Sequence, residues 1–212
     1  MQALKKVILL VGFEPFGGEP INPALEAARR LNGRRFGSCE VVTREVPVVR
    51  NLCLERLTAA IGEVDPEIVI ALGQAGGRPE ITPERVAINV DDYRIADNAG
   101  AQPVDVPVVS GGPVAYWSTL PIKAMVNAML DAGVPAKVSN SAGTFVCNHL
   151  FYGLMHHLAV EGNVRSGGFI HVPYLPEQAA RLNGQPSMAL DTIVRGIEAA
   201  LAAICTSNSM TR

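Results

Sequence analysis

Hydrophobic residues along the chain follow two patterns, and each pattern predicts a different element. Continuous apolar runs at residues 6–12, 67–73 and 168–173 are typical of short strands buried on both faces of a parallel sheet. Residues 40–48 are rich in valine and threonine and are predicted as a further strand, while residues 85–90 alternate as in a strand with one exposed face. Helical spacing predicts helices at residues 24–31, 49–64, 122–132, 148–160 and 189–204.

Strands and helices alternate along the chain without an evident linker, repeat or low-complexity tract. This order predicts one α/β/α sandwich, a single domain over residues 1–212, around a mixed, mostly parallel, twisted sheet. Residues 91–112 are rich in Asp, Asn, Gly and Pro and are expected to form an excursion of loops and short strands. Because ligands of such sheets bind at the carboxyl ends of strands, we expect the chemistry near Gly12, Gly73, Cys147 and the residues after Ile170.

Composition narrows the possible partners. The chain has 212 residues, 18% of them charged, and a net charge of −2, so neither the basic footprint of a nucleic-acid protein nor a polybasic membrane patch is present. Residues 1–7 lack the apolar core of a signal peptide, and no apolar run reaches membrane-spanning length. The four cysteines are scattered without CxxC spacing, which argues against a zinc site or a secreted disulfide framework and for a reducing cytoplasm.

Cys147 is the cysteine whose surroundings best suit a nucleophile. It follows an extended segment at residues 136–139 and a small-residue turn containing Gly143, and it precedes a helical pattern. The amides of a helix's first turn lack internal partners and carry positive partial charge, which favours thiolate over thiol. The other three cysteines lie in ordinary strand or helix contexts and are interpreted as inert core residues, which is also the common alternative for Cys147.

A cysteine nucleophile needs a base, and the chain offers four histidines. His149 lies two residues beyond Cys147 on the same helix, so it projects about 200° away and is a poor partner. His156 and His157 lie in mid-helix and are interpreted as part of a solvated face, since adjacent helical positions diverge too far for a metal pair. His171 falls at the end of an apolar strand, where a buried structural histidine and a catalytic base fit the pattern equally well.

Two further features admit both a structural and a chemical interpretation. For Glu84, at the start of the alternating strand, the pattern alone favours a surface carboxylate paired with a neighbouring arginine. The loop GFEPFGG at residues 12–18 follows a strand but lacks the GxGxxG spacing and the lysine of phosphate-binding loops. Its Phe13 and Phe16 are suited to enclosing a flat, uncharged ring, although each taken alone fits an anchor in the core.

Three motifs together resemble those of pyroglutamyl peptidase I, a family also called pyrrolidone-carboxylate peptidase. They are GFEPFGG with Asn22 and Pro23, then GQAGG at 73–77 with ITPERVAIN at 81–89, then SNSAGTFVCN at 139–148. The resemblance spans nearly the whole chain in matching order. The second and third motifs are similar to the two active-site signatures of that family.

The resemblance implies a cytoplasmic, homotetrameric hydrolase of α/β/α fold that uses no cofactor or metal and removes N-terminal pyroglutamate from peptide substrates. It makes Cys147 the nucleophile, His171 the base and Glu84 the acid of a Cys-His-Glu triad that forms an acyl-enzyme. The implied substrate-binding residues are Phe13 and Phe16, which enclose the ring, with Asn22, Gln74, Val146 and Arg94 close by.

Two other functions are compatible with the residue pattern. A nucleoside phosphorylase-like transferase also binds its ligands at glycine-containing strand ends of a sandwich, and it would not need Cys147. A non-catalytic ligand-binding domain would use the aromatic residues only as a pocket. Activity that survives alkylation would favour the transferase, and the absence of an acyl-enzyme would favour the binding domain.

Overall fold

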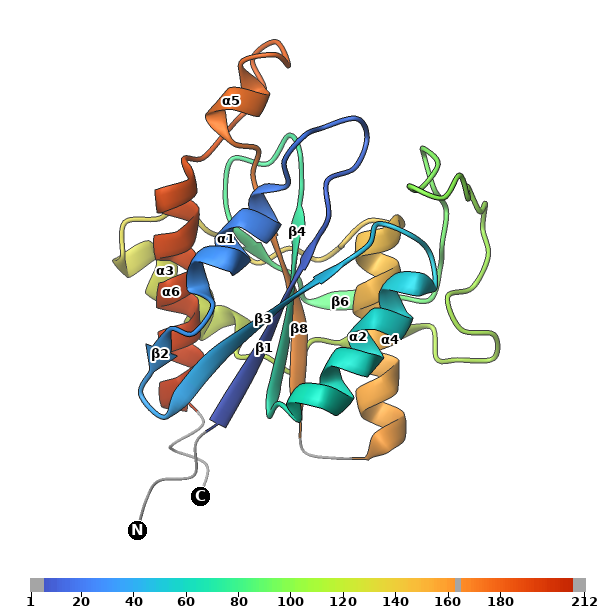
Figure 1. Ribbon diagram of the computed structural model, residues 1–212, viewed down its shortest axis with the longest axis horizontal. Coiled ribbons are helices and arrows are strands. Elements are labelled where there is room, and N and C mark those ends of the chain that lie inside the picture. Colours follow the sequence, from blue (N-terminus) through green and yellow to red (C-terminus); the bar gives the residue numbers. More distant parts are fainter. Residues whose placement is uncertain (1–5, 163–164, 208–212) are drawn as a thin grey trace.

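A six-stranded mixed sheet forms the centre of the protein (Figure 1). Its strands are β1 (Lys6–Phe13), β2 (Arg35–Phe36), β3 (Cys39–Val46), β4 (Ile68–Gln74), β5 (Thr82–Pro83) and β8 (Ser166–Val172). They lie in the order β2-β3-β1-β4-β8-β5, with β1, β3, β4 and β8 parallel and the short edge strands β2 and β5 antiparallel. The computed structural model describes residues 6–162 and 165–207. The predicted mixed, mostly parallel sheet is confirmed.

Helices cover both faces of this sheet, which gives the predicted α/β/α sandwich (Figure 1). On one face lie α1 (Pro23–Leu31), α3 (Ile122–Asp131) and α6 (Leu190–Ser207). On the other lie α2 (Leu52–Val64) and α4 (Val146–Glu161). Among the described residues no helix has both the length and the apolar character needed to cross a membrane.

β4 shows why the apolar runs form central strands. All of its residues are buried, and successive side chains point to opposite faces, so Ile70 and Leu72 join one core while Val69 and Ala71 join the other. A continuous apolar run therefore supplies apolar side chains to both hydrophobic cores. The carboxyl end of β4 therefore has fixed neighbours on each face, and this is where the site lies.

The excursion after the second motif carries a small sheet of its own. β6 (Val86–Ile88) pairs antiparallel with β7 (Ala115–Trp117), and between them residues 91–112 form loops held by one isolated bridge, Asp91 to Val106. The strand expected at 85–90 is thus shorter and belongs to this second sheet. The very short elements β2, β5, β7 and α5 (Pro176–Ala179) were not predicted, since two to four residues carry no periodic signal.

The extended segment predicted at residues 136–139 is present, but it does not form a continuous strand. This segment is extended and runs parallel to the β5 edge, but it forms only two isolated bridges, Ile81 to Ala136 and Glu84 to Ser139. The hydrogen bonds continue on either side of Pro83, which has no amide hydrogen to donate to the segment. Proline thus interrupts the ladder that would have made a continuous strand.

Helix bounds agree closely with the spacing. α1 begins as expected with Asn22 as its cap, whose Oδ1 accepts from the Ala24 amide at 3.0 Å, and with Pro23 in the first turn. α4 begins two residues earlier than predicted, so Cys147 lies inside its first turn. Residues 1–5, 163–164 and 208–212 fall outside the described part, and with them most of the N-terminal stretch interpreted above as lacking a signal peptide.

Candidate active site

Cys147 is presented by the turn that precedes α4. Gly143 has φ +79°, a left-handed conformation that glycine adopts without steric cost, and Phe145 is the extended residue that caps the helix. Cys147 is then the second residue of the helix, with the unpaired amides of the first turn around it. The turn and helix start predicted from the small residues are confirmed.

Gly73 brings the thiol to the end of the sheet. A Cβ atom on Gly73 would lie 3.1 Å from Cys147 Sγ and 2.7 Å from Cζ of Phe169, so both side chains occupy the space that glycine leaves open. In the β4–β8 ladder Gly73 is the register partner of His171. His171 is on the same face of β8 as Phe169, two residues earlier, and their rings are 4.7 Å apart. The thiol and the imidazole therefore lie on the same face of the sheet, next to Gly73.

Glu84 holds the imidazole from the opposite side. Its Oε1 accepts from His171 Nδ1 at 2.7 Å, and the two residues are 0% and 3% exposed. β5 places the carboxylate there, because Thr82 pairs with His171 and the Glu84 amide donates to the Phe169 carbonyl. The interpretation of Glu84 as a surface residue is therefore wrong. Nδ1 carries the proton in this bond, which leaves Nε2 free to act as a base.

Burial governs the protonation states of these three groups. It raises the pKa of the Cys147 thiol to about 12, an effect to which the Glu84 charge adds and which Arg78 and the helix amide oppose. Burial likewise lowers the pKa of His171, although Glu84 acts in the opposite direction. For Glu84, burial favours the neutral acid, but hydrogen bonds led by that of His171 outweigh it and lower the carboxyl pKa.

The expected thiolate stays a prediction. The helix amide favours ionisation of Cys147, but burial opposes it and is the larger effect on the thiol pKa. A thiol that is still protonated can react by passing its proton to a neighbouring base as the sulfur attacks.

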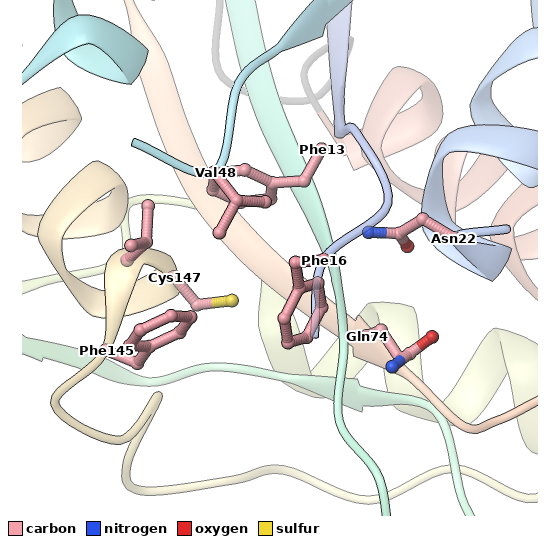
Figure 2. A pocket seen from close by; sticks show the side chains of 8 residues that line it. Phe13, Phe16, Asn22, Val48, Gln74, Phe145 and Cys147 are labelled. Atoms are coloured by element: carbon pink, nitrogen blue, oxygen red, sulfur yellow. The ribbon is translucent and has the colours of Figure 1, made fainter. Parts of the chain in front are cut away.

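A small pocket opens beside the thiol, and Figure 2 shows the rings of Phe16 and Phe145 on either side of the Cys147 sulfur. Its cavity volume is about 10 Å³, so the side chains that line it nearly fill it. The residues that line it are Phe13, Phe16, Asn22, Val48, Gln74, Phe145, Val146 and Cys147. Five of the six predicted substrate-binding residues are among them, while Val48 and Phe145 were not predicted.

The two amide side chains of the pocket are already engaged. Asn22 caps α1 with its Oδ1 and donates from Nδ2 to the Glu14 carbonyl, which fixes the start of the phenylalanine loop. Gln74 Oε1 accepts from Nε2 of the fully buried Gln178 at 3.0 Å, so the Gln74 amide nitrogen is the end left to donate. Gln178 lies far away in sequence and carried no signal that would have found it.

Arg94 is the one predicted substrate-binding residue outside this pocket. It is exposed, and it does not belong to the lining set. It follows Tyr93, which is buried and packs edge-on against Phe145 with 4.8 Å between ring centres. Its position is therefore adjacent to the pocket wall, and its role stays a prediction.

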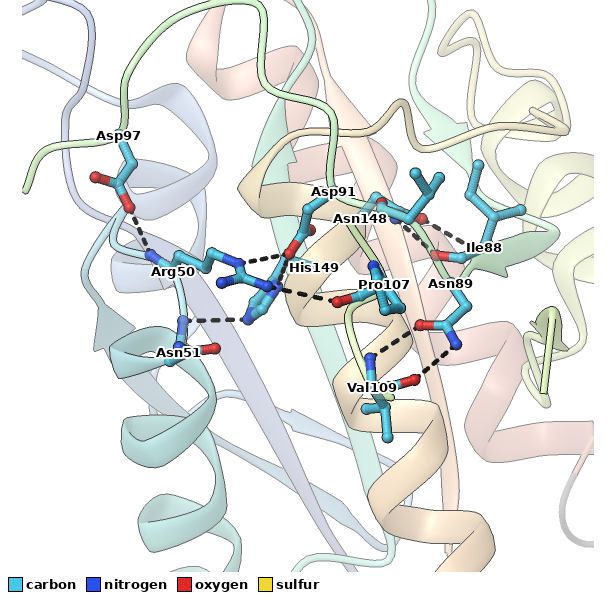
Figure 3. A network of polar contacts seen from close by, with 11 residues as sticks. Arg50, Asn51, Ile88, Asn89, Asp91, Asp97, Pro107, Val109, Asn148 and His149 are labelled. Atoms are coloured by element: carbon cyan, nitrogen blue, oxygen red, sulfur yellow. Dashed lines mark hydrogen bonds and ion pairs between the residues drawn. The ribbon is translucent and has the colours of Figure 1, made fainter. Parts of the chain in front are cut away.

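His149 has different partners from His171, as expected from its direction on the helix. Both its ring nitrogens are occupied: Nδ1 contacts Asp91 Oδ2 at 2.8 Å, and Nε2 accepts from the Asn51 amide at 3.1 Å (Figure 3). Arg50 Nε also donates to Asp91 Oδ2, at 2.7 Å. This buried network joins the start of α2, the excursion and the first turn of α4, and it fixes the helix that carries Cys147.

The remaining histidines and cysteines fit structural roles. His156 is partly buried rather than solvated, and its Nδ1 shares a hydrogen bond with the Tyr116 hydroxyl at 2.8 Å. His157 contacts Glu161 one turn further along the helix. Burial raises the pKa values of Cys53 and Cys205, which agrees with inert thiols. Among the described residues no group of His, Cys, Asp and Glu is arranged to hold a metal ion.

A thiol, an imidazole and a buried carboxylate at strand ends form the set of groups that thiol-dependent hydrolases use. Comparison with known proteins agrees with this class. A sequence model of the pyroglutamyl peptidase family matches residues 5–207. A pyrrolidone-carboxylate peptidase of Cupriavidus necator is 60% identical over 199 residues, which cover 93% of this chain and 92% of that protein. A protein of the same name from Bacillus anthracis is 58% identical over 196 residues, covering 92% and 91%.

Solved structures give the same result. Pyroglutamyl peptidase I from Bacillus amyloliquefaciens has a TM-score of 0.93 at 49% identity, with 95% of each chain covered. Pyrrolidone carboxyl peptidase from Thermococcus litoralis has a TM-score of 0.93 at 38% identity, covering 98% of this chain and 96% of that one. The chain therefore belongs to the pyroglutamyl peptidase family, and its activity is that of a pyroglutamyl-peptidase I hydrolase.

Proposed function

We propose that the protein is a cysteine exopeptidase that removes N-terminal pyroglutamate from peptides through an acyl-enzyme. Cys147 is the nucleophile, His171 the base and Glu84 the acid that orients the imidazole. The observation that carries this assignment is the 2.7 Å bond between Glu84 and His171, with the thiol packed over Gly73 beside them.

Acylation begins when Cys147 Sγ attacks the pyroglutamyl carbonyl carbon and its proton passes to His171 Nε2. The carbonyl π electrons move to oxygen, and the amides at the start of α4 stabilise the resulting oxyanion. Collapse of this intermediate breaks the C–N bond, and His171 gives its proton to the leaving amine. Peptide with a free N-terminus departs, and a thioester on Cys147 remains.

Deacylation uses the same groups in reverse. Water attacks the thioester carbonyl while His171 Nε2 accepts one of its protons, and the sulfur leaves and is reprotonated. Free 5-oxoproline is released. Glu84 keeps the proton on Nδ1 throughout, so Nε2 is the nitrogen that exchanges protons in both half-reactions.

The pocket supports recognition of a lactam ring. Pyroglutamate has no terminal ammonium, so its site needs apolar walls and few polar partners. Phe13, Phe16 and Phe145 supply the walls, and the Gln74 amide nitrogen is a donor for the lactam carbonyl. The lining set contains no charged side chain, which disfavours the phosphate-using transferase considered above.

The proposed working state is a homotetramer in the cytoplasm, as in the family that the motifs resemble. Two features support it. Val114, Trp117 and Val160 are large apolar side chains that are 87%, 67% and 72% exposed, which suits burial between subunits. A free thiol nucleophile must also stay reduced, as it does in a reducing compartment. Light scattering coupled to gel filtration tests the assembly, and a monomer would contradict it.

Hydrolysis of a pyroglutamyl fluorogenic amide, with and without iodoacetamide, tests the function. We expect turnover of the pyroglutamyl amide and none of the matching prolyl amide, which lacks the lactam carbonyl. Alkylation should abolish turnover, and mass spectrometry should find the label on Cys147. Cys53→Ala is the matched control, because that thiol is buried and does not line the pocket, so its variant should stay sensitive to alkylation. Full activity of Cys147→Ala would contradict the assignment.

A further inference from the structure

Arg78 is a charged side chain at the site that the proposed mechanism does not use. It lies in the loop after β4, and its Nη1 donates to Glu84 Oε1 at 2.6 Å and to Thr82 Oγ1 at 2.7 Å. Its Nη2 donates to the Ser141 carbonyl at 3.0 Å. The guanidinium thus joins three segments: the loop after β4, the β5 edge and the turn that leads to Cys147.

Glu84 Oε1 accepts two hydrogen bonds at once, one from Arg78 and one from His171. A fully buried carboxylate beside only a neutral imidazole would be costly to keep ionised. Arginine keeps its charge at every working pH, so it stabilises the Glu84 anion regardless of the state of His171. The Arg78 side chain is itself 29% exposed, so the cation keeps part of its hydration.

The same cation acts on the other two members of the triad. Its charge lowers the pKa of the Cys147 thiol and lowers that of the His171 imidazole, in each case alongside larger effects of burial and of Glu84. The groups that face Glu84 are His171 from β8, Cys147 from α4, Arg78, and the Ser139 hydroxyl from the bridged segment. Arg78 is the only one of these that carries a permanent charge.

The geometry points to Arg78 as a positioning residue that acts through Glu84: it fixes the carboxylate against His171 and places a permanent positive charge near the thiol. This inference rests on the proposed function of the triad. It adds a fourth residue to the catalytic arrangement, one that contacts neither the substrate pocket nor the sulfur among the described contacts.

The pH dependence of kcat/KM distinguishes this role from that of a residue that only holds the loops in place. Removing a cation raises the pKa of every neighbouring group, so Arg78→Gln should move the acid limb of the profile upward by about one pH unit. It should also lower kcat about 10- to 100-fold, with a smaller change in KM. Arg78→Lys keeps the charge but loses the two-pronged geometry, so its acid limb should stay in place while kcat falls.

Arg85→Gln is the matched control. Arg85 is the next arginine along the chain and also bridges to the 139–141 segment, through Asn140 Oδ1 at 2.7 Å, but it makes no bond to Glu84. The Arg85→Gln variant should keep kcat within twofold of the wild-type value and its acid limb within a few tenths of a pH unit of the wild-type position. The inference would be overturned if the acid limb of Arg78→Gln stayed at the wild-type position. It would also be overturned if the acid limb of Arg78→Lys moved as far as that of Arg78→Gln.

Two further measurements keep the test decisive. If Arg78 acts through Glu84, adding Arg78→Lys to Glu84→Gln should lower kcat no further. If the two substitutions lowered kcat by the product of their separate effects, the inference would be contradicted. This test stands even if Arg78→Gln fails to fold. The iodoacetamide reaction of Cys147, followed by mass, should slow in Arg78→Gln at a given pH. This readout needs no turnover, so it succeeds or fails independently of the pyroglutamyl activity.

Discussion

Gly73→Ala tests whether the thiol lies where the structure places it. The new methyl carbon would be 2.7 and 2.9 Å from two Phe169 ring carbons and 3.1 Å from Cys147 Sγ, all closer than ordinary contacts. Phe169 has little room to move, because its ring packs against Phe151, at 5.8 Å between centres, and against His171. Overpacking of this kind costs about 1–3 kcal/mol, or a Tm lower by about 2–12 °C.

Activity should fall more than stability. The methyl group displaces the sulfur and, through Phe169, the imidazole, and a displacement near 1 Å costs on the order of 100-fold in rate. Gly62→Ala is the matched control: nothing lies within 4 Å of its new Cβ, and in the last turn of α2 the substitution should stabilise by up to about 0.5–1 kcal/mol without changing kcat. Wild-type kcat/KM and Tm in Gly73→Ala would refute the reasoning that the sulfur and the imidazole lie together on the face of the sheet at this glycine.

Three further predictions concern the triad and the pocket. Glu84→Gln should lower kcat about 10²–10⁴-fold, less than His171→Ala, because the base stays but its tautomer is no longer fixed; equal losses measured in steady-state kinetics would contradict this order. Phe16→Ala should raise KM about tenfold, the equivalent of about 1.4 kcal/mol, while Phe13, at 2% exposed, is expected to cost stability as well; an unchanged KM would exclude the loop from recognition. The acid limb of the kcat/KM profile should lie below pH 6.5, because burial lowers the pKa of His171. The free energy of unfolding should fall as the pH drops below 6.5, because His171 takes up a proton in the unfolded chain before it does so in the folded protein. An acid limb above pH 7 would contradict a lowered His171 pKa.

Periodic features of the chain were predictable because they depend on local patterns. Buried strands such as β4 have continuous apolar runs, and α1 has a polar cap followed by proline, so both were found from the sequence. The interruption of the hydrogen-bond ladder at Pro83 was not predicted. The sequence shows that proline lacks an amide hydrogen, but this matters only once the 136–139 segment is known to lie beside Pro83.

Features that depend on distant contacts were beyond the sequence. Glu84 appeared to be a surface residue because nothing near it in the chain shows that His171 and Arg78 enclose it. The protonation of Cys147 was predicted from the helix amides alone, and the larger effect of burial needs the packed structure. The roles of the triad came from the resemblance to a family rather than from spacing, and the geometry is consistent with them.

The central claim is that Cys147 becomes acylated with assistance from His171. Rapid quenching of the protein with a pyroglutamyl ester, followed by digestion and mass spectrometry, tests it most directly. We predict a pyroglutamyl thioester on the peptide that contains Cys147, accumulating further in wild type than in His171→Ala. Turnover of the ester with no acylated Cys147, or with the acyl group on another residue, would contradict the account.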